Sequence, residues 1–418
     1  MIAVAAALLL STFISAWQAV RANAKAATAW KARQTETQLR EQAQASERRA
    51  WVATAEAHSI VRFLGDWMIG ASRPANQMGG LRKDVTLREA IDSAEAVVAT
   101  AFPNKPLTEA IVRTLFGKTY ADLGESGAAI HQLELAAQLT RATLGDEHID
   151  TLSSINNLAV VCARFGQFDK ALSYFEETHG QLQRLVDPNH PELLMSMHNL
   201  AGVYQNVGRL DEAISLLEET LRRQQTTFGP DHPLSLMTIT NLAVVHDMAK
   251  DYAQAETLFR KSLSLQQRAD GQQRGLMLDT QAFLGRTLLH QQKHAEAVVV
   301  LLACTEESQN VQPNFWQTYY YQTLLGDALH RKAFNLRPDE QSAADNTLAK
   351  AEVLLRKGCE GMLAREDTMF AQHKPLIAEA VENLITLYEQ RARPEDAARW
   401  RGKLEARNSP EKPTKCGL

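Results

Sequence analysis

Residues 199–213 read NLAGVYQNVGRLDEA, and two related stretches flank them at a fixed distance. NLAVVCARFGQFDKA occupies 157–171 and NLAVVHDMAKDYAQA occupies 241–255, so the three stretches begin 42 residues apart. A skeleton that returns at a fixed step of this size is typical of a solenoid, in which each repeat is a helical unit that packs on the next one. The asparagine that opens the skeleton serves either packing or binding, and its role has to be decided separately.

The register of small and turn residues extends over a longer part of the chain. Each unit reads as helix, tight turn, helix and loop, and the loops end in similar sequences, LGDEH, VDPNH and FGPDH. The turn position holds Gly124, Gly166, Gly208, Lys250 and Gln292 in successive units. The residues that we expect to pack the repeat are Ala171, Gly166, Ala201, Tyr204, Gly208, Ala213, Ala255 and Ala297.

Composition agrees with an all-α fold. Aromatic residues make up 6% of the 418 residues, and no stretch shows the alternating, β-branched pattern that strands require. The internal spacing of leucine, alanine, tyrosine and glycine resembles the 42-residue tetratricopeptide (TPR) repeats of kinesin light chains. This resemblance implies a TPR α-solenoid, a right-handed superhelix of helical hairpins, with the matching repeats at 107–311.

The remaining segments lie on either side of these repeats. A helix expected at 81–106 leads into the array, and Thr86 followed by Glu89 has the spacing of a capping box. Divergent repeats are expected at 312–407, with a polar loop NLRPDEQSAAD (335–345) between two helices, and a disordered tail at 408–418.

The first twenty residues, MIAVAAALLLSTFISAWQAV, carry no charged side chain. Such a run is long enough to cross about 30 Å of hydrocarbon, so 1–20 is predicted to be a transmembrane helix, with a cleaved signal peptide as the alternative. Residues 21–70 are predicted to form a helical stalk, whose weak seam of small and apolar residues leaves a homodimer as one alternative. The basic residues after the span favour a cytoplasmic location for the array.

A second resemblance covers nearly the whole chain. The segments WQAVRA, FLGDWMIGAS, GCEGMLARED and ENLITLYEQRARPEDAARWRGKL, together with the repeats, are similar to the C-terminal part of bacterial membrane-anchored serine/threonine kinases. That topology implies an array outside the cytoplasm, opposite to the charge pattern, so the side of the membrane stays open. The sequence holds no glycine-rich phosphate loop, VAIK-type lysine, HRD or DFG element, so kinase activity is not implied here.

Several kinds of site are not expected from the sequence. The four cysteines have no CxxC pair, and the loop histidines His148, His190 and His232 occur once per repeat, too far apart to share one metal ion. A net charge of −4 gives no sign of nucleic-acid binding. We expect no catalytic residues, no metal, no cofactor and no enzymatic activity.

The asparagines Asn157, Asn199 and Asn241 form the candidate binding site. Helix interiors disfavour asparagine, so three in register on the first helix of each repeat need a reason. The resemblance to kinesin light chains implies that these amides bind the backbone of an extended peptide in the concave groove, and the structural alternative is that each amide bridges neighbouring helices. Four further residues lie on the same helical stripe: Ser154, Ser196, Arg164 and Asn206.

The function expected from the sequence is a membrane-tethered TPR module that binds a peptide or protein segment in its groove. The alternative is a non-catalytic sensor or scaffold part of a split or truncated transmembrane kinase. The localisation expected with either function is a single-pass bacterial membrane protein.

Overall fold

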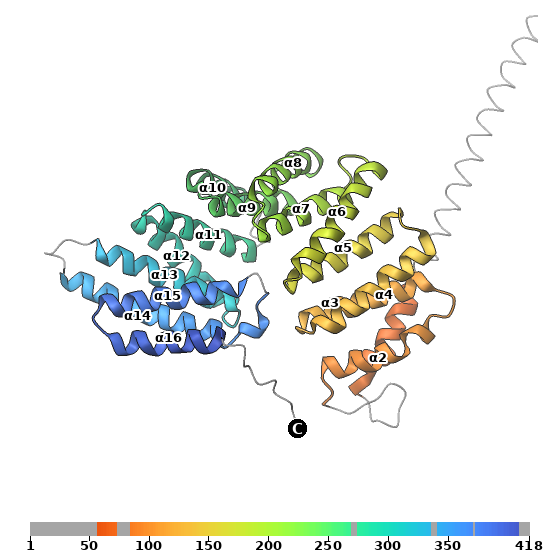
Figure 1. The fold of residues 1–418 in the computed structure, drawn as a ribbon, viewed down its shortest axis with the longest axis horizontal. Coiled ribbons are helices and arrows are strands. Elements are labelled where there is room, and N and C mark those ends of the chain that lie inside the picture. Colours follow the sequence, from red (N-terminus) through yellow and green to blue (C-terminus); the bar gives the residue numbers. More distant parts are fainter. Residues whose placement is uncertain (1–56, 73–83, 269–273, 336–340, 371–372, 409–418) are drawn as a thin grey trace, which may run out of the picture. The chain divides into compact units, whose positions relative to one another are not determined.

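The structure is a computed structural model that describes residues 57–72, 84–268, 274–335, 341–370 and 373–408 (Figure 1). The chain divides into two compact units, Met1–Pro103 and Asn104–Leu418, each of which is described by itself. Within the described ranges every regular element is a helix, as the composition predicted.

The first unit contains short helical segments. A helix over 57–64 continues into the π-helical turn η1 (Gly65–Ile69) and the 3-10 turn η2 (Gly70–Ser72), and α2 (Leu87–Ala101) follows. The predicted capping box is present, because the backbone N of Glu89 donates to Thr86 Oγ1 over 3.2 Å and the backbone N of Thr86 donates to Glu89 Oε2 over 2.9 Å. This reciprocal pair satisfies two of the backbone donors that a helix start leaves open.

The membrane localisation expected from the sequence is contradicted. In the part of the chain that the structure describes, no helix combines the length and the apolar character needed to cross a membrane. A span needs about 20 mostly apolar residues, whereas these helices carry polar side chains on at least one face. The segment 1–20 and residues 21–56 of the expected stalk lie outside the described residues, and the single-pass localisation is not carried further.

The second unit is a succession of helical hairpins, in which each first helix packs against its own second helix and against the first helix of the next hairpin. Figure 1 shows α8 and α10 on the outer side of the curved array, with α7 and α9 on the inner side. The five hairpins that follow the 42-residue step are α3 (Pro106–Asp122) with α4 (Ser126–Leu144), α5 (Ile149–Arg164) with α6 (Phe168–Leu185), α7 (Pro191–Asn206) with α8 (Leu210–Phe228), α9 (Pro233–Met248) with α10 (Tyr252–Arg268), and α11 (Arg274–His290) with α12 (His294–Val311).

Small residues let the two helices of a hairpin approach closely. Ala201 on α7 and Ala213 on α8 are both fully buried, and their equivalents in neighbouring repeats are also buried. In the first hairpin the equivalent of Ala201 is Gly117, where an added Cβ would lie 2.6 Å from Leu133 Cγ. Close contact of this kind allows no larger side chain without a backbone shift, which explains why the position returns as alanine or glycine.

The turn between the two helices keeps one conformation even where glycine is replaced. The backbone angle φ is positive at Gly124, Gly166 and Gly208, at 82°, 79° and 80°, and it remains positive at Lys250 (65°) and Gln292 (61°). A left-handed residue ends the first helix, and glycine adopts this conformation at the lowest cost. The packing of the hairpin therefore imposes the turn on Lys250 and Gln292.

The later hairpins depart from the regular pattern. They are α13 (Trp316–Phe334) with α14 (Gln341–Leu363), and α15 (Pro375–Gln390) with α16 (Pro394–Asn408). The polar loop predicted at 335–345 is too long, because α14 already begins at Gln341; the residues QSAAD contain two alanines, which favour helix. Apart from residue 408, which ends α16, the tail predicted at 408–418 lies outside the described residues.

Candidate functional site

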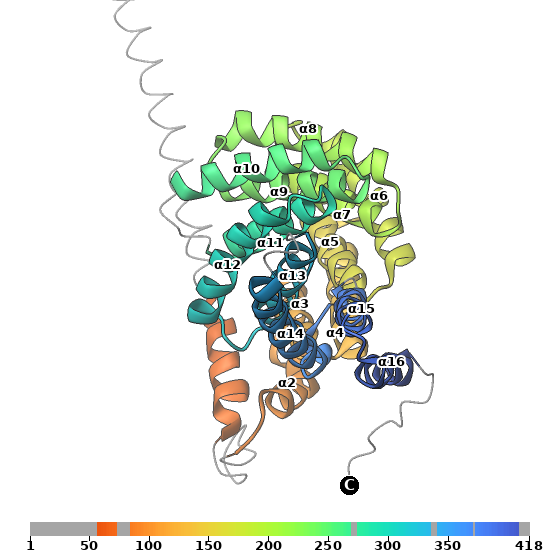
Figure 2. The ribbon, with the colours of Figure 1, turned by 90° about the vertical axis from the view of Figure 1, so that its left-hand side faces the viewer.

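The inner surface of the array is formed by the first helices of the repeats. Neighbouring first helices contact one another from α3 to α15 within the second unit, and Figure 2 shows their succession from another side. Equivalent positions of successive first helices therefore form rows that cross from repeat to repeat, and side chains one turn apart form a stripe along each helix. The predicted asparagine row lies on α5, α7 and α9.

A cavity of about 300 Å³ opens on this surface. It lies against α5 and α7 and also includes one residue each of α6 and α9 and one residue from the loop before α15. Its lining residues are Val160, Ala163, Arg164, Phe175, His198, Asn199, Gly202, Val203, Asn206, Asn241 and Phe370. Four of the seven residues predicted to bind peptide, namely Arg164, Asn199, Asn206 and Asn241, are thus brought together.

Two of the three asparagines bridge neighbouring repeats. Asn241 Nδ2 donates to His198 Nε2 over 3.1 Å, and Asn199 Nδ2 donates to Asn156 Oδ1 over 3.4 Å. In both cases the acceptor belongs to the residue directly before the equivalent asparagine of the previous repeat. Within the described residues no hydrogen bond reaches the Oδ1 atom of Asn199 or Asn241, so both carbonyl oxygens keep their capacity to accept a hydrogen bond, and both residues line the cavity.

His198 completes this arrangement and was not singled out by the sequence. Its Nδ1 lies 3.0 Å from Thr238 Oγ1, and burial lowers its pKa to about 4. The imidazole is therefore neutral near pH 7, and because Asn241 donates to Nε2, the proton is on Nδ1 and is donated to Thr238. A signal existed in the sequence, since His198 stands one residue before Asn199, where Asn156 stands before Asn157.

Among the described residues that line this cavity, Arg164 is the only one with a cationic side chain. Its Nη1 donates to Asp122 Oδ1 in the preceding repeat over 2.6 Å, and its Cζ lies 4.2 Å from the centre of the Phe370 ring. The carboxylate fixes the direction of the guanidinium, and the ring covers one of its faces. Phe370 comes from the divergent C-terminal region, where no periodic signal identified it.

Three predicted residues do not line the cavity, and Asn206, which does, uses its amide within its own helix. Ser196 is only 1% exposed, so its assignment to the groove surface is wrong; the stripe turns inward at this position of α7. Ser154 Oγ donates to Asp150 O over 2.9 Å within its own helix, and Asn206 Nδ2 donates to Gly202 O over 2.7 Å. Asn157 is half-buried and does not line the cavity.

The loop histidines have a structural role at the helix starts. The Nδ1 atoms of His148, His190 and His232 accept hydrogen bonds from the backbone two residues later, at 3.2, 3.2 and 3.3 Å. Each histidine is thus the N-cap of α5, α7 or α9 and satisfies a donor that the helix leaves open. Among the residues that the structure describes, no three histidine, cysteine, aspartate or glutamate side chains are grouped so that they could hold a metal ion.

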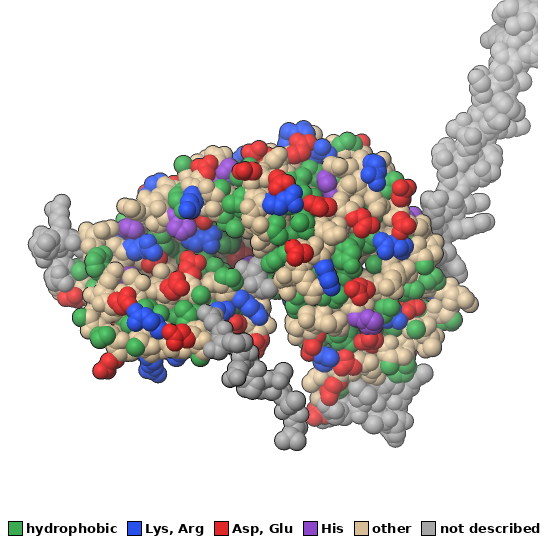
Figure 3. All heavy atoms as spheres, in the orientation of Figure 1, with side chains coloured by type: hydrophobic (Ala, Val, Ile, Leu, Met, Phe, Trp, Pro, Cys, Tyr) green, Lys and Arg blue, Asp and Glu red, His purple; other side chains and the backbone are tan. Residues whose placement is uncertain are grey.

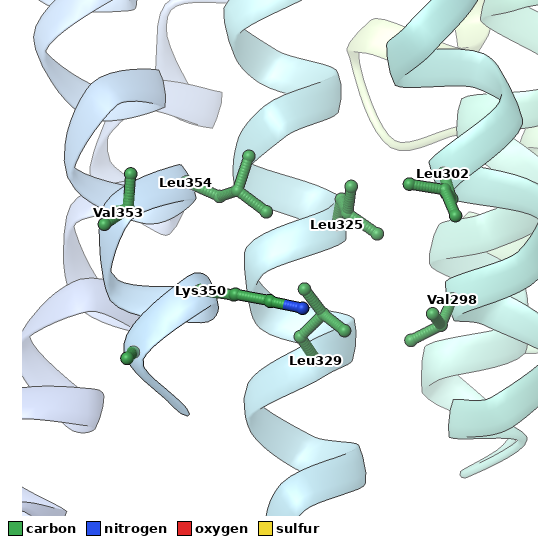
Figure 4. Close-up of a pocket in the computed structure, with 8 residues that line it drawn as sticks. Val298, Leu302, Leu325, Leu329, Lys350, Val353 and Leu354 are labelled. Carbon is green, nitrogen blue, oxygen red and sulfur yellow. The ribbon is translucent and has the colours of Figure 1, made fainter. Parts of the chain in front are cut away.

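A second cavity lies on a different part of the array, between α12, α13 and α14, with a volume of about 540 Å³ (Figure 4). In the close-up, Val298 and Leu302 face Leu325 and Leu329, and Lys350 extends its amino group across the opening. A ligand site normally combines an apolar lining with several convergent polar groups. Among the described residues that line this cavity, Lys350 is the one with a polar side chain, and none of them is a predicted site residue.

Comparison with known proteins identifies the repeats. A family model described as tetratricopeptide repeat matches residues 108–184 and 192–268. These two segments are tetratricopeptide repeats. The match covers α3 to α10, and thus includes all of the asparagine row.

Solved structures agree with a TPR-like solenoid. The apo form of the quorum sensor NprR from B. thuringiensis superimposes with a TM-score of 0.55 at 14% identity, covering 77% of this chain and 81% of that one, which shows a shared fold. Repeats of a putative kinesin light chain from Podosopora anserina are 25% identical, with a TM-score of 0.43 over 48% of this chain and 95% of theirs. A Rap protein complexed with Competence and Sporulation Factor is 15% identical, with a TM-score of 0.47 over 80% of this chain and 86% of its own.

None of the curated proteins matches this sequence. The similarity to kinesin-light-chain repeats, which the sequence predicted, is found among the solved structures. The resemblance to membrane-anchored kinases gains no support from these comparisons.

Proposed function

We propose that the TPR array is a protein-interaction module that binds an extended peptide segment along α5, α7 and α9. The observation that carries this proposal is the cavity in which the amides of Asn199 and Asn241 converge with Arg164. An extended peptide presents backbone N–H groups at regular intervals, and the two Oδ1 atoms suit them as acceptors.

The rest of the lining supplies contact rather than charge. Val160 is 42% exposed and gives the groove a shallow apolar wall next to Arg164. In the space-filling view, acidic and basic side chains are interspersed over the visible face of the array instead of being gathered by sign (Figure 3). This pattern favours a partner that is recognised through its backbone and one or two side chains, and it gives no support to recognition by bulk charge.

Selection from a phage-displayed library of random peptides tests the proposal. Selected peptides should bind the wild-type chain and lose affinity by about 5- to 150-fold in the Asn199→Ala/Asn241→Ala variant, since each of the two lost hydrogen bonds contributes about 0.5–1.5 kcal/mol. Asn189→Ala, at an exposed loop position, is the matched control and should change nothing. The groove would be refuted as a peptide site if the selected peptides bound the wild type and the Asn199→Ala/Asn241→Ala variant equally well, or if the library yielded no binding peptide.

A further inference from the structure

A loop from the C-terminal repeats reaches into the groove of the first repeats. We call residues Arg365–Phe370, which follow α14, the strap. The strap places Phe370 against Arg164 on α5, and an added Cβ on Gly124 would lie 4.0 Å from the backbone oxygen of Asp367. In a solenoid each repeat normally contacts only its neighbours, so a contact between α5 and the segment after α14 is outside the repeat pattern.

The strap is held at its base by the last repeats. Arg365 Nε donates to Asn314 O over 2.7 Å, and the Arg365 guanidinium lies 4.4 Å from the centre of the Tyr319 ring. Glu366 Oε1 accepts from Arg407 Nε over 3.0 Å. These contacts fix the direction in which the loop leaves α14.

The Phe370 side chain is less buried than its neighbour in the strap, since Met369 is only 4% exposed and packs in the core of the later repeats. Phe370 is 37% exposed, and it lines the same cavity as Asn199 and Asn241. Its contact with Arg164 is a cation–π pair, which stabilises a partly exposed site only modestly. The Phe370 ring also stacks on His373, with 5.8 Å between the ring centres. The contact with Arg164 can therefore open by movement of the Phe370 side chain, while Met369 stays in the core.

Arg164 is the group for which the strap and a ligand would compete. Its guanidinium is already directed by Asp122, and the Phe370 ring that covers one of its faces lines the same cavity. A tethered occupant acts at a high effective concentration, on the order of millimolar, even when its own contact is weak. An incoming segment therefore meets an occupied site.

We propose that the strap is an intramolecular occupant of the groove, and that a peptide ligand must displace Phe370 to reach Arg164. This inference rests on the proposed function, because it assigns the regulation of the same site. The strap would thus set a threshold for binding and would couple ligand capture to release of the C-terminal repeats from α5.

Phe370→Ala tests the contact without any ligand. Hydrogen exchange of the full chain should show the amides of 366–370, and those at the C-terminal end of α5, exchanging about 2- to 30-fold faster, the range that a cation–π contact spans. Phe334→Ala removes a phenylalanine at the end of α13 that is 62% exposed, against 37% for Phe370, and it is the control for loss of an exposed aromatic ring outside the strap. Phe370→Leu keeps the apolar bulk and should give an intermediate increase, which serves as the readout if the alanine variant unfolds.

The affinity arm uses library peptides selected separately on the wild-type and Phe370→Ala chains. Peptides should bind the Phe370→Ala chain about 2- to 30-fold more tightly than the wild type, with no gain in Phe334→Ala. Unchanged exchange in both Phe370 variants, or equal affinities for wild type and Phe370→Ala, would overturn the strap. Faster exchange with no peptide selected on either chain would instead refute the proposed function and the displacement step with it, and would leave the intramolecular contact standing.

Discussion

The side-chain amide of Asn241 donates a hydrogen bond across the repeat boundary to Nε2 of His198, over 3.1 Å. Asn199 makes the corresponding contact one repeat earlier, with Asn156. The structural and the binding interpretation of the asparagine row are therefore compatible, because one amide can join two helices through its N–H group and still present its oxygen to the groove. The contribution to folding and the contribution to binding have to be separated by measurement.

A double-mutant cycle separates them for Asn241. Asn241→Ala should lower the free energy of unfolding by about 1 kcal/mol, the usual net contribution of such a hydrogen bond, and should couple to His198→Ala by a similar amount. Urea denaturation of the four chains measures the coupling. Asn157→Ala is the comparison, because within the described residues its side chain shows no bond to a neighbouring repeat, and a smaller loss is expected. An equal loss at Asn157 would show that the bond to His198 is not the cause.

The stability of the array should fall in mild acid because of His198. Its pKa is lowered from 6.5 to about 4 by burial, so the unfolded chain takes up the proton first. Stability from this group is therefore fully present above about pH 6.5 and is lost as the pH falls toward 4. Between pH 7 and pH 5 the loss should be roughly 2 kcal/mol.

His198→Gln provides the control for this pH dependence. Glutamine can accept from Asn241 but does not titrate, so the variant should lose roughly 2 kcal/mol less than the wild type between pH 7 and pH 5. The comparison between the two chains is needed because burial also lowers the pKa of His373 to about 4. Identical pH profiles for wild type and variant would show that His198 titrates at an ordinary pKa in the folded chain.

The repeat architecture could be predicted from the sequence because its causes are local and periodic. The small residue Ala213, the turn at Gly208 and the capping box at Thr86 each follow from spacing along the chain, and the structure places them in buried, left-handed and N-cap positions respectively. The loop predicted at 335–345 is too long, because its polar composition indicates a loop whereas the helix propensity of its last five residues lets α14 begin at Gln341.

The candidate site was only partly predictable. Arg164, Asn199, Asn206 and Asn241 share a stripe that helical periodicity identifies. Phe370 enters the cavity through a contact between distant repeats, and no local pattern encodes such a contact. Ser196 satisfies the stripe but is buried, because a count along the helix does not show how far the neighbouring repeat covers each position.

Lys250→Gly should stabilise the array. Lys250 is exposed and adopts φ of +65° at the turn where earlier repeats use glycine. A side chain in this conformation costs roughly 1–2 kcal/mol, which is offset in part by the greater freedom of glycine in the unfolded chain, so a net gain of about 0.5–1 kcal/mol is expected. Thermal denaturation measures the gain. Gly208→Ala, the reverse change at the equivalent turn, should be destabilising, and a gain there would contradict the argument.

Gly285→Ala should destabilise the array, although a helical glycine is usually improved by alanine. A Cβ at Gly285 would lie 2.4 Å from Leu301 Cγ on α12, so the helices of this hairpin must move apart, at a cost of about 1–3 kcal/mol. Gly180→Ala in α6 is the matched control: a Cβ there meets nothing within 4 Å, and the change should stabilise by about 0.5–1 kcal/mol. Urea denaturation of both variants should therefore give shifts of opposite sign. Stabilisation by both would mean that Leu301 can move aside without loss, and that close approach is not what selects glycine at this position.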